Sequence, residues 1–171
     1  FGIYFKLQSF IYMPANGLIQ GMRPLISYNY GARHFDRVKK IIKVSIISTA
    51  VILCCGTIIF MGLPELVLSW FNATEQLLEI GIIGLRVISP CFILSTMGVV
   101  ISGVFESLGK GRQSLTISLL RQFIITLPLA YILLKVIGLN GIWLSFVIAE
   151  GIASVIAVIL IKKELHNFKV D

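Results

Sequence analysis

Residues 20–43 read QGMRPLISYNYGARHFDRVKKIIK, and this stretch decides the fold. One apolar segment runs into it and another leaves it, while its second half carries five bases from Arg33 to Lys43 against the single acid Asp36. Bases gathered between two apolar segments are typical of the cytoplasmic end of paired membrane helices. We therefore expect one helix to end near residue 28, a cytoplasmic loop over residues 29–39, and a second helix from about residue 40.

The same alternation of apolar windows and charges continues through the chain. Of its 171 residues, 57% are hydrophobic and 13% are charged, whereas soluble domains average about 25% charged residues. A membrane span needs about 20 mostly apolar residues, and no charge interrupts the window from Lys43 to Glu65 or that from Arg86 to Glu106. The sequence predicts an all-α, polytopic transmembrane helix bundle with five spans, over about residues 4–28, 40–63, 75–108, 113–136 and 142–161.

The bases predict the orientation of this bundle in a plasma (inner) membrane. We expect the loop 29–39, the turn 109–112 and the C-terminus to be cytoplasmic, because Lys and Arg accumulate on that side. Lys135 is the one base near an outer turn, and Lys6 has no assigned side. Because most of the bases lie in loops between the spans, the net charge of +7 indicates a lipid bilayer as partner and no nucleic acid. Ten bases lie in or beside the three cytoplasmic segments: Arg33, Arg37, Lys39, Lys40, Lys43, Lys110, Arg112, Lys162, Lys163 and Lys169.

The first span contains more polar residues and prolines than a lipid-facing helix needs. Pro14 and Pro24 free backbone carbonyls, which membrane helices tolerate where neighbouring helices or water satisfy them. Asn16 and Gln20 lie four residues apart and hence on one face. They either form interhelical hydrogen bonds or line a pathway, and we take Asn16, Gln20 and Pro24 as candidate cavity-lining residues.

Three charges fall deep inside the predicted spans, at a cost of at least about 2.5–3.5 kcal/mol each. Arg86 lies about 16 Å from the outer end of its helix and, with Ser89, is a candidate cavity-lining residue; Pro90 is expected to interrupt that helix. Arg121 and Glu150 lie about 14 and 18 Å from the inner ends of antiparallel spans, so they are expected to meet. Either they form a fixed pair that locks the two spans, or Glu150 faces the cavity as a protonatable or cation-attracting group.

The sequence shows no enzyme constellation: no serine elbow, no paired carboxylates on one helix face and no His-Cys-Asp cluster. We therefore expect a protein that is not an enzyme, with no metal site and no cofactor. Both histidines, His34 and His166, lie in segments predicted to be cytoplasmic, where a solvated imidazole is the usual state. Three cysteines within the spans are expected to be packing residues with no disulfide: Cys54, Cys55 and Cys91.

The segment over residues 64–79 is expected to lie on the outer side of the membrane and to form a short helix at the membrane surface. Its apolar residues should lie on one side, with Trp70 in the aromatic belt at the membrane surface. Asn72 with Glu75 resembles a capping box for the third span, and residues 72–74 also match a glycosylation sequon. The expected apolar side comprises Leu66, Val67, Trp70 and Phe71.

Several motifs, in order, resemble the multidrug and toxic compound extrusion family. GLIQGMRPLISYNYGARHFDRVKK (residues 17–40) is similar to the segment after the second helix of one of its lobes. Leu85-Arg86 with Pro90, and FESLGKGR (residues 105–112), resemble the fourth lobe helix and its turn. Arg121-Gln122 with Pro128-Leu129, and GLNGIW (residues 138–143), resemble the fifth helix and the turn that follows it.

The resemblance implies a fold and a function for the whole protein. The family has two six-helix lobes around a central cavity and exports amphipathic cationic drugs in exchange for sodium ions or protons. The chain begins with Phe1, so we expect a segment of a longer protein: helices eight to twelve of twelve in a partial C-terminal lobe over residues 1–171. Its partners would be small-molecule cationic drugs and the missing N-terminal lobe.

One departure concerns the coupling ion. Sodium-coupled relatives share acidic residues in helices seven and ten, but helix seven is missing here and the span from Arg86 to Glu106 holds no carboxylate. Coupling is then expected to depend on a carboxylate outside this segment. The alternatives are a lipid-linked oligosaccharide flippase of the same superfamily, which a groove rich in bases would favour, and a non-transporting membrane scaffold.

Overall fold

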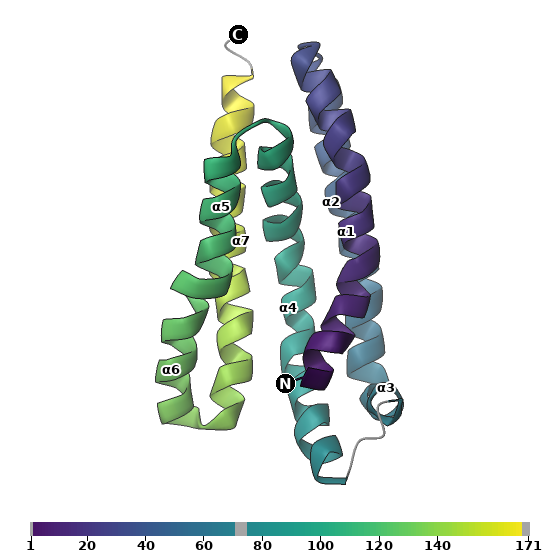
Figure 1. Cartoon of the computed structure of the whole chain (residues 1–171), viewed down its shortest axis with the longest axis vertical. Coiled ribbons are helices and arrows are strands. Elements are labelled where there is room, and N and C mark those ends of the chain that lie inside the picture. The colour runs from purple at the N-terminus through teal and green to yellow at the C-terminus, as the bar shows by residue number, and fades with distance from the viewer. Residues whose placement is uncertain (1, 71–74, 169–171) are drawn as a thin grey trace.

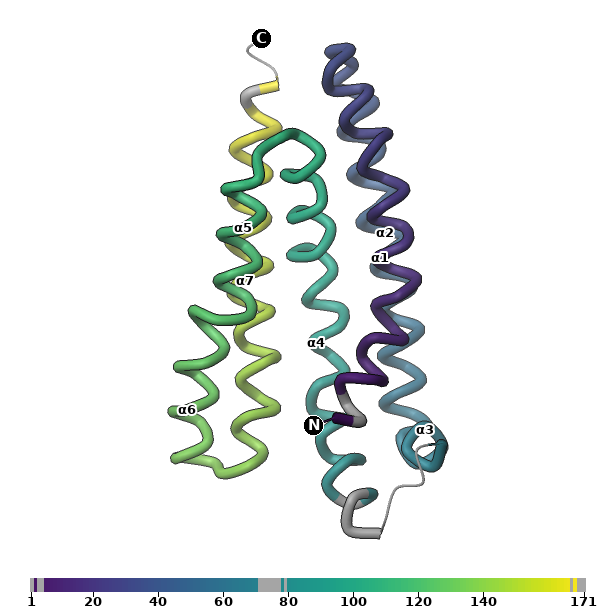
Figure 2. Tube along the Cα trace, in the orientation of Figure 1, coloured from purple at the N-terminus to yellow at the C-terminus, as the bar shows by residue number. Residues whose placement is uncertain are grey.

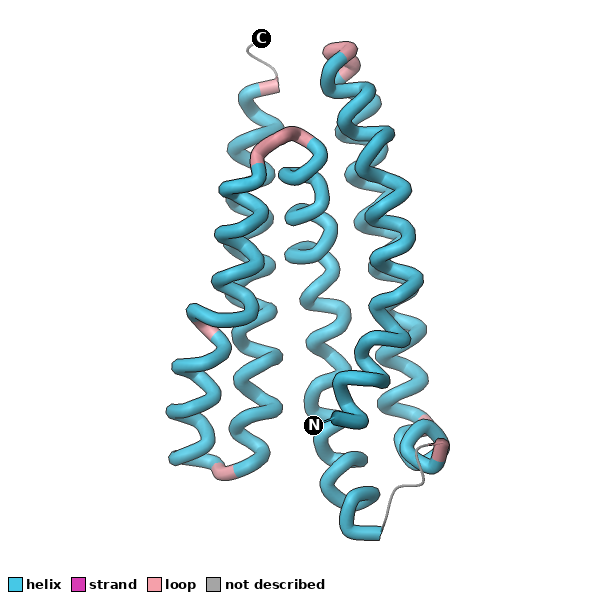
Figure 3. The backbone as a smooth tube through the Cα atoms, viewed as in Figure 1, coloured by secondary structure: helices cyan, strands magenta, loops and turns pink. Residues whose placement is uncertain are grey.

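The computed structural model describes residues 2–70 and 75–168, and these residues form helices joined by short turns, without a strand (Figures 1 and 3). This confirms the all-α prediction. The elements are α1 (Gly2–Gly31), α2 (Phe35–Gly62), α3 (Pro64–Ser69), α4 (Glu75–Ser107), α5 (Gly111–Leu119), the π-helix η1 (Leu120–Ile124), α6 (Thr126–Ile137) and α7 (Leu139–Asn167).

Four helical stretches are long and apolar enough to cross a membrane: Phe35–Gly62, Ile80–Ser107, Gly111–Ile137 and Leu139–His166. The first predicted span, over residues 4–28, corresponds to α1, which has 30 residues but does not meet this test of composition. It nevertheless lies beside α2 along the bundle (Figure 1). The protein is therefore a polytopic membrane protein. Four of its described helical stretches qualify as spans by length and composition, whereas the sequence predicts five.

Helix α4 lies at the centre of the bundle. It packs against α1 and α2 on one side and against α5 and α7 on the other (Figure 2). The α1–α2 turn, the α4–α5 turn and the C-terminal end of α7 all lie at one end, while α3 and the α6–α7 turn lie at the other. We call the first of these the basic end, because it gathers the basic segments that the sequence predicts on one side of the membrane.

The apolar core consists of two clusters stacked along the bundle. The cluster nearer the basic end contains Val38, Ile42, Val104, Phe105 and Ile161. The cluster nearer the other end contains Leu53, Phe60, Phe92 and Trp143, among other residues. Polar side chains from α2, α4, η1 and α7 lie between the two clusters. We call them the polar layer, and they are Thr49, Ser95, Thr96, Arg121, Glu150 and Ser154.

The fourth predicted span is not one regular helix. It is divided into α5, η1 and α6 (Figure 1). Pro128 has no backbone N–H and its ring crowds the carbonyl four residues earlier, which belongs to Ile124, the last residue of η1. Such prolines widen or kink the preceding turn. By contrast, α4 runs through Pro90 without a break, so the interruption expected there is wrong.

The outer segment differs from its prediction as well. Helix α3 ends at Ser69, and its apolar residues do not share one exposed side. Val67 and Leu68 are buried against the core, whereas Leu66 and Trp70 are exposed, because one residue along a helix is a rotation of about 100°. Phe71, the sequon at residues 72–74 and the Asn72 cap lie outside the described residues.

Candidate functional site

Arg121 and Glu150 meet in the middle of the bundle. The Nε atom of Arg121 lies 3.3 Å from Oε1 of Glu150, and their side chains are only 19% and 12% exposed. Arg121 comes from η1, whose wider turn is a geometry often found at functional sites, and Glu150 comes from α7. Gly98 of α4 lies beneath the arginine, since a Cβ atom there would be 3.7 Å from its Cδ. The contact predicted from the two depths is therefore present.

The second carboxylate oxygen of Glu150 has no hydrogen-bond partner among the described residues, although it is buried. The hydroxyl oxygens of Thr49 and Thr96 are also buried and have no hydrogen-bond partner among the described residues. Three of the four such atoms in the described part of the chain thus belong to the polar layer. A buried polar atom without a partner costs about 1–3 kcal/mol, and ionisable groups inside membrane bundles are usually functional. The polar layer is accordingly the candidate site.

A second ion pair lies nearer the basic end, between α1 and α4. Arg23 Nη2 lies 2.5 Å from Glu106 Oε2, and both side chains are about half exposed. The Ser114 hydroxyl donates to Glu106 Oε1 at 2.8 Å. Sequence reasoning missed this pair. Opposite charges near the same ends of the first and third spans were the signal for it.

A small polar pocket connects the two ion pairs. It has a volume of about 180 Å³ and lies between α1, α4, α5 and η1. Ser102 lies 2.7 Å from the Ser114 hydroxyl and 3.4 Å from that of Ser118, so hydroxyl groups follow one wall. The arrangement provides hydrogen bonds and charges of both signs for a small polar group. Its polar lining consists of Asn16, Arg23, Ser102, Glu106, Ser118 and Arg121.

The other residues predicted for the cavity are not gathered at this pocket. Gln20 and Pro24 are exposed on α1, and neither Asn16 nor Gln20 makes a side-chain hydrogen bond with any described residue. Arg86 is exposed on α4 and has no ion pair among the described residues. Ser89 is fully buried, and its hydroxyl donates to the Leu85 carbonyl at 2.5 Å, so its role within this chain is helix packing.

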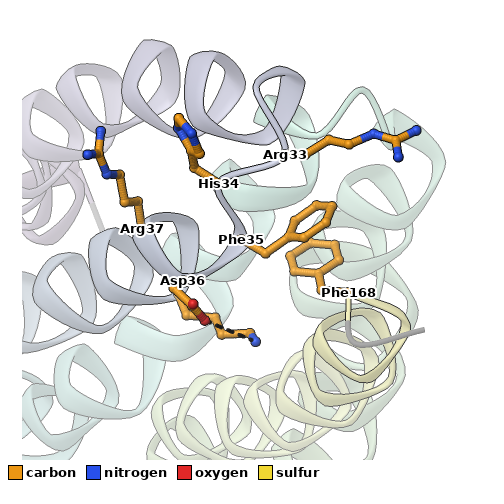
Figure 4. A pocket seen from close by; sticks show the side chains of 7 residues that line it. Arg33, His34, Phe35, Asp36, Arg37 and Phe168 are labelled. Atoms are coloured by element: carbon orange, nitrogen blue, oxygen red, sulfur yellow. Dashed lines mark ion pairs between the residues drawn. The ribbon is translucent and has the colours of Figure 1, made fainter. Parts of the chain in front are cut away.

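A wide surface groove lies at the basic end, over the α1–α2 turn. It has a volume of about 740 Å³ and includes Arg33, His34, Arg37 and Lys39. Figure 4 shows Arg33 pointing away from Arg37 and His34, with the Phe35 ring stacked on Phe168 at 4.9 Å. Because the cations diverge, they do not converge on a single ligand. The described residues contain no cluster of three or more His, Cys, Asp or Glu side chains that could hold a metal ion.

Long apolar helices that enclose a polar layer and a buried ion pair define an integral membrane protein with a polar interior. The family model described as MatE matches residues 1–132, which is most of the chain. The chain belongs to the MatE family. This confirms the family that the sequence motifs indicate.

The similar curated proteins are multidrug export proteins. The chain is 30% identical over 172 residues to the multidrug export protein MepA of Staphylococcus haemolyticus (strain JCSC1435), covering all of this chain and 37% of that protein. It is 29% identical to MepA of Staphylococcus aureus (strain MSSA476), covering 38% of it. The chain thus spans little more than a third of the length of these relatives.

Solved structures of the family share the fold. An outward-facing multidrug resistance MATE family transporter of the MOP superfamily matches with a TM-score of 0.94 at 19% identity, over all of this chain and 39% of that one. The MATE multidrug transporter DinF-BH matches with a TM-score of 0.89 at 29% identity, over all of this chain and 38% of that one. The helices therefore have the arrangement of part of a MATE transporter.

Proposed function

We propose that the full-length protein exports amphipathic organic cations, drugs among them, in exchange for sodium ions or protons. Membership of the MatE family and the similarity to multidrug export proteins support this proposal. In it, residues 1–171 form helices eight to twelve of a C-terminal lobe, and a second lobe completes the cavity. The basic end faces the cytoplasm, so export runs toward the end that carries α3.

The observation that carries the proposal is the free oxygen of Glu150 in the polar layer. Glu106 and Glu164 are the other carboxylates on α4 and α7 whose surroundings are described, and both are paired near the basic end, with Arg23 and Lys110. Glu150 alone among these three lies at mid-depth and has a buried oxygen without a hydrogen-bond partner among the described residues. Such an oxygen can take up a proton or attract a cation, and either event weakens the ion pair between Glu150 and Arg121.

A change in that pair would act on two helices at once, since Arg121 belongs to the widened turn η1 and Glu150 to α7. Transporters of this kind work by rocking of one lobe against the other around a central site. The exposed face of α1 with Asn16, Gln20 and Pro24 then contributes to the wall of the cavity. Asn16 also lines the polar pocket, which places it between the cavity wall and the ion pairs.

Lipid-linked oligosaccharide flipping is less well supported. That function would favour a groove with an excess of unpaired bases, because its substrates carry phosphates. In the polar pocket, Arg23 is paired with Glu106 and Arg121 with Glu150. The charges therefore balance, which suits a transporter of cations better than one of large anions.

Ethidium accumulation in cells that make the full-length protein tests this function. We expect lower dye retention than in empty-vector cells, and restored retention when the proton and sodium gradients are collapsed. Glu150→Gln keeps the size of the side chain and removes its charge, so it should abolish gradient-driven efflux at an equal amount of protein in the membrane. Glu65→Gln, on the exposed outer segment, is the matched control and should transport normally.

Two results would count against the proposal. If neither gradient lowers dye retention relative to the empty vector, the protein is not such an exporter. If Glu150→Gln transports like the wild type but unfolds at a lower temperature, Glu150 only locks the two helices.

A further inference from the structure

A second groove, between α1 and α2, has a different character from the polar pocket. It has a volume of about 560 Å³ and almost entirely apolar walls. Its single charged lining residue is Lys40, which lies on the first turns of α2 at the basic end. The remaining lining residues are Leu18, Gly21, Met22, Leu25, Ile41, Val44 and Ser45.

Lys40 shares one face of α2 with a second cation, Arg37, which lines the wide groove at the basic end. Arg37, Lys40 and Val44 follow one another at spacings of three and four residues, so their side chains project in one direction. Arg37 and Lys40 are exposed and form no ion pair with any described residue. The nearby acid Asp36 is fully exposed and lies 3.8 Å from Lys39, so it does not neutralise them.

We propose that this groove binds one anionic phospholipid from the leaflet at the basic end. One acyl chain lies between α1 and α2 along Leu18, Met22 and Val44, and the phosphodiester lies between Lys40 and Arg37. Basic residues beside a membrane span attract anionic headgroups, and an apolar groove below them suits the attached chain. The site shares no lining residue with the polar pocket and does not depend on the proposed function.

Another helix of the full-length protein is the competing occupant. A helix seated in the groove would cover Lys40 and remove it from water, and an unpaired buried lysine in a membrane protein is costly. A phospholipid instead supplies the counter-charge and the apolar chain together. The balance of charge therefore favours the lipid.

Gly21 offers a way to block the site without disturbing the fold. A Cβ atom built at Gly21 meets no other atom within 4 Å, so a larger side chain at this position projects into the groove. Gly21→Leu should fill the space for the acyl chain. Lys40→Gln should remove one headgroup contact and leave the apolar groove intact.

The test uses the purified full-length protein in detergent, titrated with dioleoylphosphatidylglycerol or, for comparison, dioleoylphosphatidylcholine. Binding is measured by native mass spectrometry and by the rise in the thermal unfolding midpoint. We expect the wild type to prefer the anionic lipid. Lys40→Gln should weaken that binding about fivefold, as one basic residue near an anionic surface does, and Gly21→Leu should abolish the lipid-induced rise while the midpoint without lipid stays unchanged. Lys163→Gln, an exposed cation at the basic end outside this groove, is the control and should bind like the wild type.

Three results would overturn the proposal. One is equal binding of the two lipids by the wild type. Another is undiminished lipid-induced stabilisation of Gly21→Leu. The third is a large drop in the lipid-free midpoint of Gly21→Leu together with no lipid binding by the wild type, which would show that a helix of the same protein occupies the groove.

Discussion

Arg23 of α1 lies 2.5 Å from Glu106 of α4 and joins the two helices beside the polar pocket. The Arg121–Glu150 pair joins η1 to α7 in the middle of the bundle. The two pairs differ in exposure: the side chains of the first are 44% and 40% exposed, those of the second 19% and 12%. This difference predicts unequal contributions to stability.

Glu106→Gln should lower the free energy of unfolding by no more than about 1 kcal/mol, because half-exposed ion pairs contribute little and the Ser114 hydroxyl can still donate to the amide oxygen. Thermal unfolding of the full-length protein in detergent measures the change. Glu65→Gln on the exposed outer segment is the control. A loss of several kcal/mol would show that the pair is far better shielded than its exposure indicates.

Exchanging the central charges should separate structure from function. Arg121→Glu and Glu150→Arg should each cost about 3–5 kcal/mol, since each leaves like charges buried together. The double variant restores opposite charges and should recover much of that loss. Its dye efflux should nevertheless stay below that of the wild type, because the free carboxylate oxygen no longer comes from α7. Full recovery of efflux would show that only the presence of a pair matters.

Gly141→Ala should loosen the hairpin formed by α6 and α7. A Cβ atom there would clash with the carbonyl oxygen of Leu133, and this backbone atom cannot rotate away, so we expect a loss of about 1–3 kcal/mol. Gly17→Ala is the matched control, because its Cβ meets nothing within 4 Å and alanine favours a helix by up to about 1 kcal/mol. The unfolding midpoints of the two variants should therefore shift in opposite directions.

Sided labelling of introduced cysteines checks the orientation. Arg112→Cys, at the start of α5 beside the α4–α5 turn, should react with a membrane-impermeant maleimide only after the cells are opened. Asn140→Cys, at the start of α7 beside the α6–α7 turn, should react in intact cells, because the two turns lie at opposite ends of the bundle (Figure 1). The reverse pattern would place the basic end outside.

The sequence predicted the helices and the central pair better than the helix faces. Depth along a span is a matter of counting residues, so the depths of Arg121 and Glu150 could be matched from the sequence alone. Which way a side chain points was harder to predict, because lipid and core are equally apolar and the helices show little amphipathic pattern. Ser89 and Arg86 illustrate this limit: both lie in α4, yet one is fully buried and the other exposed.

The sequence also could not predict which prolines would interrupt a helix. Prolines mark where a helix lacks a hydrogen bond, but neighbouring contacts decide whether it bends. Pro90 lies within α4 beside the buried residues Ser89 and Cys91, and the helix continues through it. Pro128 follows the half-exposed η1, and there the turn widens.

The position of Arg121 also constrains how the chain enters the membrane during synthesis. Arg121 leaves the ribosome before Glu150, and alone it would enter the bilayer at a cost of about 2.5–3.5 kcal/mol. The tight turn at Gly138, with a φ angle of 75°, brings α7 back against α6 as soon as both have emerged. If α5 through α7 insert as one unit, Arg121 enters the bilayer already paired with Glu150.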